Sequence, residues 1–348
     1  MRGKNSINSA SWRRWVKSRS AVLAIGLVAM ASTAEAKPFA YVTNQGANTV
    51  SVIDTDTNAV VVTVPVGNNP YGVAGTPDGK HAVANQGANN VSVIDTAINT
   101  VVVTVPVGNN PYLVAVALDG KHAYVANGGS KNVSVIDTGT NTVVATVPVG
   151  TAPIGVAVTP DGKHVYVANG GSANVSVIDT ATNTVLATVP VGTNPRSIAV
   201  TPDGTRAYVT SQSSSNVSVL DTATNTVAAT VTIENNPPAV DTPRNIAVGN
   251  NPRGVAVTPD GKYTYVVNSR FNTVSVIDTG TNTVVATVPV GDVPHGLAIT
   301  PDGKHAYVAN SNSANVSVID TGTNTVVATV PVGIVPYVVG ILDVRGPK

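Results

Sequence analysis

The chain has 348 residues, of which 43% are hydrophobic and 11% are charged, and it contains no cysteine. Globular proteins usually carry about 25% charged residues, so this composition excludes a charge-rich disordered chain and a long coiled coil. The lack of cysteine excludes a small disulfide-stapled domain, and a net charge of +1 provides no overall basic field for nucleic acid or a membrane surface.

Residues 1–36 have the layout of a secretory signal peptide. Six cationic residues precede an apolar stretch of 11 residues, Ala21 to Ala31, and Ala34-Glu35-Ala36 supplies small residues before a cleavage site. The apolar stretch is too short to span about 30 Å of hydrocarbon as a helix, although an anchored amphipathic helix is an alternative. Arg13-Arg14 hints at twin-arginine export, but Trp15-Val16-Lys17 fits that pattern poorly and favours general secretion. We expect an exported protein, periplasmic, secreted or on the cell surface, that begins at Lys37.

Removal of this segment changes the charge of the chain. Six of the 20 cationic residues and one of the 19 acidic residues lie in it, so the remaining 14 and 18 give a net charge of −4. Both tryptophans and both methionines also lie there, and the resulting lack of thioether and indole suits an oxidising compartment. No later apolar run reaches 18 residues, so we expect no membrane span after residue 36.

A repeated unit occupies residues 37–348, which we expect to form one domain. The string S-V-[IL]-D recurs 41 or 42 residues apart, except for one interval of 57, and it ends at Asp54, Asp95, Asp137, Asp179, Asp221, Asp278 and Asp320. Each unit contains four β-branched runs separated by short turns, as in Gly155–Thr159, His164–Ala168, Asn174–Asp179 and Val185–Val191. Connections this short predict an antiparallel meander.

The residues of each run predict its place in a sheet. The fourth run carries a proline in six of seven units, and Thr232 replaces it in the other. Because proline cannot donate to a strand ladder, the fourth strand is the edge strand. The second run is apolar on both faces, which favours sheets covered on both sides and repeated about an axis, the blades of a propeller. The fold class predicted is all-β, a seven-bladed β-propeller with four antiparallel strands per blade.

The ends of the repeat region predict how the ring closes. The first repeat opens on a second strand, Phe39–Thr43, whereas residues 337–343 match a first strand. A linear solenoid would leave both ends incomplete. Pairing of the C-terminal strand with the first one closes the ring and removes an exposed edge.

The strings Tyr41-Val42-Thr43-Asn44, Tyr124-Val125-Ala126-Asn127 and Tyr307-Val308-Ala309-Asn310, together with SVID and TPDG, resemble the YVTN-repeat β-propeller family over residues 38–343. That family includes surface-layer proteins and exported bacterial propellers. The resemblance implies the fold, but the family shares architecture more than chemistry. The second unit departs from the motif at Ala82-Val83-Ala84-Asn85, and the fifth at Tyr208-Val209-Thr210-Ser211.

Antiparallel strands place the loops on two faces. We call the face with the links from fourth to first strands the top, and the face with the Pro-Asp-Gly and Asp-Thr-x-Thr-Asn turns the bottom. Four of five histidines repeat at one bottom position, where copies spread round a ring cannot converge on a metal: His81, His122, His164 and His305. No nucleophile elbow, zinc-binding helix or phosphate-binding glycine loop is present in the sequence. We therefore predict no metal, no cofactor and no catalytic residues.

The repeats differ most at one position at the entrance to each first strand, which we call the rim: Tyr71, Tyr112, Ile154, Arg196, Arg253, His295 and Tyr337. These residues are predicted to surround the top mouth of the central channel. The interval of 57 adds a segment on the same face, with Glu234, Asp241 and Arg244 as candidate contacts. Arginine can pair with an anion and tyrosine offers an apolar wall with a polar tip, so we expect binding here. A variable rim without a ligand is the alternative.

The sequence favours an exported, non-enzymatic binding scaffold that contacts an unknown ligand or protein partner through its top face, and we expect a monomer. A hydrolase or lyase of the lactonase type is one alternative, for which only His295 and Asp292 are nearby acid–base candidates. Another alternative is a propeller that binds single-stranded nucleic acid by stacking. The net charge of −4 argues against strong binding of this kind. A structural surface coat is a further alternative.

Overall fold

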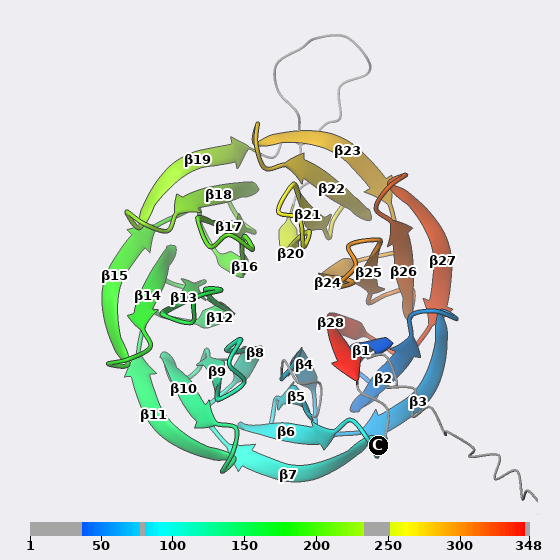
Figure 1. Cartoon of the computed structure of the whole chain (residues 1–348), viewed down its shortest axis with the longest axis horizontal. Coiled ribbons are helices and arrows are strands. Elements are labelled where there is room, and N and C mark those ends of the chain that lie inside the picture. Colours follow the sequence, from blue (N-terminus) through cyan, green and yellow to red (C-terminus); the bar gives the residue numbers. More distant parts are fainter. Residues whose placement is uncertain (1–36, 77–80, 233–250, 345–348) are drawn as a thin grey trace, which may run out of the picture. The chain divides into compact units, whose positions relative to one another are not determined.

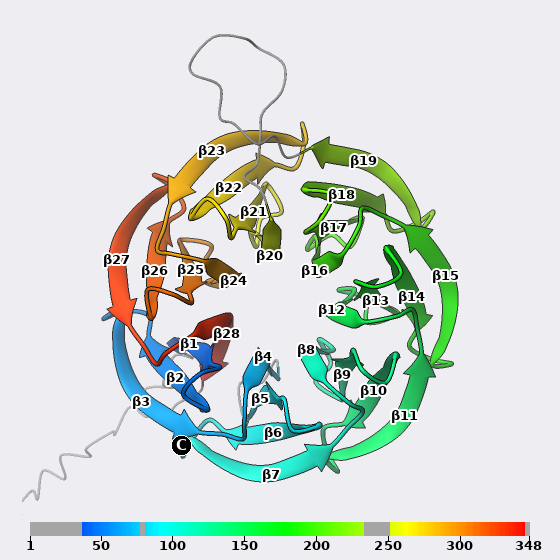
Figure 2. The same cartoon turned by 180° about the vertical axis from the view of Figure 1, so that it is seen from behind.

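The computed structural model describes residues 37–76, 81–232 and 251–344, all within the compact unit Ala34–Lys348. These residues form seven four-stranded antiparallel sheets arranged around a central axis (Figure 1 and, from behind, Figure 2). The prediction of an all-β, seven-bladed propeller is confirmed. The predicted signal peptide lies outside the described residues.

The innermost strand of each blade lines the central channel. These strands are β4 (Pro70–Gly75), β8 (Pro111–Val116), β12 (Pro153–Val158), β16 (Pro195–Val200), β20 (Pro252–Val257), β24 (Pro294–Ile299) and β28 (Pro336–Val344). The second strands are β1 (Lys37–Asn44), β5 (His81–Gln86), β9 (His122–Asn127), β13 (His164–Asn169), β17 (Arg206–Ser211), β21 (Tyr263–Asn268) and β25 (His305–Asn310).

The third and fourth strands complete each blade toward the outside. The third strands are β2 (Thr49–Asp54), β6 (Asn90–Asp95), β10 (Asn132–Asp137), β14 (Asn174–Asp179), β18 (Asn216–Asp221), β22 (Thr273–Asp278) and β26 (Asn315–Asp320). The outer edge strands are β3 (Ala59–Pro65), β7 (Thr100–Pro106), β11 (Thr142–Pro148), β15 (Thr184–Pro190), β19 (Thr226–Thr232), β23 (Thr283–Pro289) and β27 (Thr325–Pro331). We number the blades one to seven in the order β28-β1-β2-β3, β4–β7, and so on to β24–β27.

The C-terminal strand β28 closes the ring. It pairs antiparallel with β1 from Lys37 opposite Val344 to Asn44 opposite Pro336. The first blade is therefore built from both ends of the repeat region, in the order β28-β1-β2-β3. This arrangement confirms the predicted closure and leaves no blade incomplete.

The core lies between blades, where tyrosines of the second strands are buried. Tyr124, Tyr166 and Tyr307 are at most 2% exposed. Tyr166 donates a hydrogen bond to Asn225 Oδ1 of the next blade at 2.6 Å. Equivalent bonds follow at four further blade interfaces: Tyr41–Asn99, Tyr208–Asn282, Tyr265–Asn324 and Tyr307–Asn58. The tyrosine thus fills the space between blades and fixes their register.

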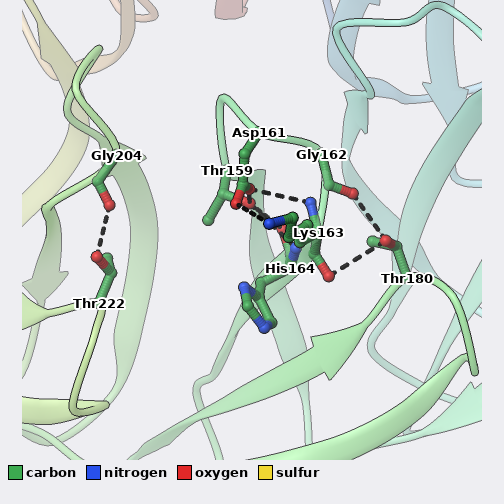
Figure 3. Close-up of polar contacts among 8 residues, drawn as sticks. All are labelled: Thr159, Asp161, Gly162, Lys163, His164, Thr180, Gly204 and Thr222. Carbon is green, nitrogen blue, oxygen red and sulfur yellow. Dashed lines mark hydrogen bonds and ion pairs between the residues drawn. The ribbon is translucent and has the colours of Figure 1, made fainter.

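Hydrogen bonds made by threonine and aspartate side chains stabilise the bottom turns, as Figure 3 shows for the fourth blade. Thr159 Oγ1 donates to Asp161 Oδ1 at 2.6 Å and accepts from the backbone N–H of His164 at 3.0 Å. Gly162 follows with φ of +71°, a conformation that glycine adopts without strain. Thr180 Oγ1, from the turn after β14, donates to the Gly162 carbonyl at 2.7 Å. The repeated aspartates are therefore turn residues, as predicted.

Candidate functional site

A bulge at the start of each innermost strand points one side chain into the channel. In the fourth blade, Pro153 pairs with Asn169 and Gly155 pairs with Ala168, so Ile154 has no partner of its own. The same shift follows Pro70, Pro111, Pro195, Pro252 and Pro294, and it lies near Pro336 in β28. Bulges redirect side chains in this way beside functional sites. The strand begins at Pro153 rather than at the predicted Gly155 because of this bulge.

The structure brings the seven rim residues together around one cavity. In ring order from the first blade, they are Tyr337, Tyr71, Tyr112, Ile154, Arg196, Arg253 and His295. Three aromatic residues and an isoleucine therefore occupy one arc, and the two arginines and the histidine occupy the other. The rim is polarised, with an apolar arc opposite a basic arc.

The tyrosines of the apolar arc contact one another through their rings. Tyr71 packs edge-to-face against Tyr112 and Tyr337, with centroids 5.1 and 4.8 Å apart. The His295 ring stacks on Tyr337 with centroids 4.2 Å apart, which connects the two arcs. Such pairs are typically stabilising by about 0.5–1.5 kcal/mol beyond the area they bury. The rim is therefore packed before any ligand binds.

Arg253 links the basic arc to the aromatic one. One of its terminal nitrogens lies 2.8 Å from His295 Nδ1 and donates to the Tyr337 hydroxyl at 3.2 Å. A guanidinium only donates, so Nδ1 accepts and the imidazole proton is on Nε2. Burial, followed by the charges of Arg253 and Arg196, lowers the pKa of His295 to about 3. His295 is therefore neutral near pH 7, with an Nε2–H available as a donor.

Arg196, the second arginine of the rim, is hydrogen-bonded to a neutral side chain. Arg196 Nε donates to Gln212 Oε1, which also accepts from the Asn194 side chain at 3.2 Å. Burial, together with the charge of Arg253, lowers the pKa of Arg196. Arg253 Nε is buried without a hydrogen-bond partner. Of the described residues that line the cavity, none carries a carboxylate, so two guanidinium charges face it uncompensated.

Threonines of neighbouring blades fix the backbone of the rim. Thr43 Oγ1 donates to the Tyr71 carbonyl at 2.7 Å, and Thr210 Oγ1 donates to the Arg253 carbonyl at 2.6 Å. Our sequence analysis did not assign a role to these threonines or to Gln212. A partial signal was present, because only the first and fifth units carry threonine at this position, whereas Gln212 has a counterpart in Gln45 of the first unit.

The remaining predicted candidates either lie away from the cavity or fall outside the described residues. Asp292 is exposed on the top face, where its carboxylate accepts from Asn272 at 2.8 Å, so its expected place beside the acid–base site is wrong. Glu234, Asp241 and Arg244 lie outside the described residues. His122, His164 and His305 lie at the start of second strands, on the bottom side. Within residues 37–76, 81–232 and 251–344, no cluster of three metal-binding side chains is found, and no helix there could cross a bilayer.

Comparison with known proteins gives a partial family match. The family described as "Lactonase, 7-bladed beta-propeller" matches residues 180–328, less than half of the chain. The matched segment contains Arg196, Arg253 and His295, the whole basic arc. Over this segment the chain is similar to the lactonase-type seven-bladed propellers. No curated protein matches its sequence significantly.

Similar solved structures are propellers with diverse descriptions. A chain of the Kuenenia stuttgartiensis hydrazine synthase is 26% identical, with a TM-score of 0.68 over 78% of this chain and 89% of that one. A functionally unknown protein from Desulfotomaculum acetoxidans is 19% identical, with a TM-score of 0.72 over 86% and 98% of the two chains. A protein from Bacteroides uniformis described as a candidate 6-phosphogluconolactonase is 18% identical, with a TM-score of 0.74 over 88% and 100%.

These matches correct the function expected from the sequence. A non-enzymatic binding scaffold was the main expectation, and the lactonase type was an alternative. The match to a lactonase family across the basic arc, with a lactonase-like structural neighbour, favours the alternative instead. The physical reason for the error is that the relevant side chains come from single positions in separate blades, so they form no continuous catalytic motif in the sequence.

Proposed function

We propose that the protein is a hydrolase of the lactonase type that opens an anionic lactone at the rim. The observation that carries this proposal is the basic arc: two guanidiniums and a neutral imidazole face one cavity without a carboxylate among its described lining residues. The same arc lies within the segment that matches the lactonase family. A negatively charged substrate supplies the missing countercharge.

Recognition of the substrate rests on the polarity of the rim. The volume of the cavity is about 90 Å³, which gives room for a carboxylate or phosphate group. Buried Arg253 Nε is a free donor for that group, and guanidiniums bind such anions through paired hydrogen bonds. The rest of the substrate would contact Tyr71 and Tyr112, whose ring faces suit the C–H surface of a sugar.

The chemistry requires stabilisation of an oxyanion. Water attacks the lactone carbonyl carbon, the carbonyl oxygen becomes negative, and the ring C–O bond then breaks. The proton of the attacking water is passed on to the ring oxygen that leaves, so the products are a carboxylate and a hydroxyl after loss of one further proton. The His295 Nε2–H and a guanidinium N–H are the donors placed to stabilise the developing charge. Because His295 is neutral, it can donate without adding a third positive charge.

The test is hydrolysis of a matched pair of substrates. Purified protein is mixed with 6-phosphoglucono-δ-lactone or with glucono-δ-lactone, and acid release is followed in a pH-stat against the uncatalysed rate. We expect turnover of the phosphorylated lactone well above background, and weaker turnover of the neutral one. Rates equal to background for both lactones would contradict the proposal.

Two further assignments are proposals of the same kind. We propose that the chain is a YVTN-repeat propeller, which is supported by the repeated Tyr-Val-x-Asn and SVID strings. We also propose that it is exported after cleavage before Lys37, which is supported by the charge and apolar pattern of residues 1–36. N-terminal sequencing of protein recovered outside the cytoplasm tests export, and an intact residue 1 there would contradict it.

A further inference from the structure

A second cavity, distinct from the rim, opens on the bottom face between the third and fourth blades. Its volume is about 330 Å³, and its lining includes Leu118, Asp119 and Tyr124 from the third blade with Asp161 and Gly162 from the fourth. This is within the range of small-molecule sites, about 300–1,000 Å³. The proposed lactonase chemistry does not use it.

The cavity arises where one bottom turn departs from the repeat. Five other blades read Thr-Pro-Asp-Gly at this turn, whereas the third reads Ala117-Leu118-Asp119-Gly120. In the fourth blade, the Pro160 ring lies 3.5 Å from the Cβ position of Gly204 in the next turn. Equivalent contacts join Pro202 with Gly261 and Pro259 with Gly303. Next to the third blade, nothing lies within 4 Å of that position at Gly162.

Leu118 therefore does not fill the place of the proline. Its side chain is instead 61% exposed at the edge of the cavity. The space between the two turns stays open because a proline ring is fixed against the neighbouring turn and a leucine is free to turn away. The gap is thus a consequence of this altered turn, in which leucine stands in place of proline.

The altered turn and the blade interface beside it also make fewer polar contacts than their counterparts in other blades. Ala117 lacks the hydroxyl that Thr159, Thr201, Thr258 and Thr300 donate to the following aspartate. Asp119 therefore lacks that bond and keeps the one from the Lys121 backbone N–H at 2.9 Å. Tyr124 is only 2% exposed, yet its hydroxyl makes no hydrogen bond among the described residues. Asn183 Oδ1, the acceptor equivalent to Asn225, is buried and unpaired. Polar groups this buried usually have a partner, so the structure points to one that binds here.

The charges of the residues that line the cavity indicate what kind of ligand it would bind. Asp119 and Asp161 are the two carboxylates of the described lining, which also includes His122 but neither lysine nor arginine. Asp161 has Lys163 at 3.9 Å, whereas no ion pair to Asp119 is found within the described part of the chain. Carboxylate and phenol oxygens accept hydrogen bonds, and Leu118 and Pro160 offer apolar contact. We infer that this cavity binds a small organic cation, a primary ammonium on a short alkyl chain.

The probe that tests the inference is n-butylammonium, with 1-butanol as the neutral molecule of the same shape. The full chain is labelled with ¹³C in its ten tyrosine rings, and ring resonances are followed by NMR during titration. The resonance missing from Tyr124→Phe belongs to Tyr124. We expect that resonance to shift saturably with n-butylammonium and not with 1-butanol. No shift, or an equal shift with 1-butanol, would overturn the proposal.

Three variants distinguish the cavity from general charge effects. Asp119→Asn should weaken n-butylammonium binding about tenfold, the effect expected for loss of one charge-assisted contact. The double variant Ala117→Thr with Leu118→Pro restores the common turn and should abolish the shift. Asp203→Asn, at the equivalent place in the fifth blade, should leave it unchanged. Unaltered binding in Asp119→Asn or in the restored turn would refute the assignment, as would equal weakening in Asp203→Asn.

Discussion

The hydroxyl groups of buried tyrosines donate hydrogen bonds to the next blade. Because the blades repeat, a tyrosine that makes this bond can be compared with an equivalent tyrosine that does not. Tyr166 and Tyr124 occupy equivalent buried positions, but only the Tyr166 hydroxyl bonds to the next blade. We expect Tyr166→Phe to lower the free energy of unfolding by about 1–2 kcal/mol, because it also leaves the half-buried Asn225 Oδ1 without this partner. Tyr124→Phe should change it by less than about 0.5 kcal/mol. Denaturant unfolding measures both, and equal losses would contradict the hydrogen-bond assignment.

The lowered pKa of His295 makes the stability of the folded protein depend on pH in the acid range. Its pKa is lowered to about 3 in the folded state, against an ordinary value of about 6.5 in the unfolded chain. Between these values the unfolded state binds more protons, so this contribution to stability is present above pH 6.5 and is lost as the pH falls toward 3.

The corresponding prediction compares His295→Gln with the parent protein. From pH 7 to pH 4 the parent should lose about 2 kcal/mol more stability than the variant, a value reduced from the full pKa shift because the side chain is partly solvated. His164→Gln, at a bottom turn, is the matched control and should follow the parent. Parallel loss of stability in the parent and in His295→Gln would show that His295 is not kept neutral.

At the scale of elements, the innermost strand β28 closes the ring without a covalent bond. Deletion of residues 336–348 removes the partner of β1 and exposes its edge. We expect the shortened protein to lose its cooperative unfolding transition or to associate, as seen by calorimetry and size-exclusion chromatography. Deletion of residues 345–348 alone, outside the described strand, is the control. A monomeric, fully cooperative 336–348 deletion would contradict the closure.

Much of this element structure is readable from the sequence, because each strand carries a local signal. The proline at the end of strands such as Thr184–Pro190 identifies the edge, and the spacing of the SVID aspartates counts the blades. The bulge after Pro153 is not readable, because it depends on pairing with Asn169 across the sheet. The innermost strand therefore begins earlier than predicted.

For the molecule as a whole, the differences between repeats predict where the rim lies, but they do not predict which contacts its side chains make. Arg196, Arg253 and His295 stand out because they differ among near-identical units. Their contacts could not be predicted, since they depend on the angles between blades and on side-chain rotamers. The contact of Arg253 with His295, which sets the proton position on the imidazole, is of this kind. The expectation of a non-enzymatic scaffold was wrong for the same reason.

The central claim is that the basic arc recognises the anion of a lactone and promotes its hydrolysis. The most direct measurement is kcat/KM for 6-phosphoglucono-δ-lactone and glucono-δ-lactone in the parent, Arg253→Lys and Arg196→Gln/Arg253→Gln. The account predicts that the double variant loses about 100-fold on the phosphorylated lactone, and loses at least about tenfold of its preference over the neutral one. Arg253→Lys should retain part of that preference, because it keeps the charge. An unchanged preference in the double variant would contradict the account.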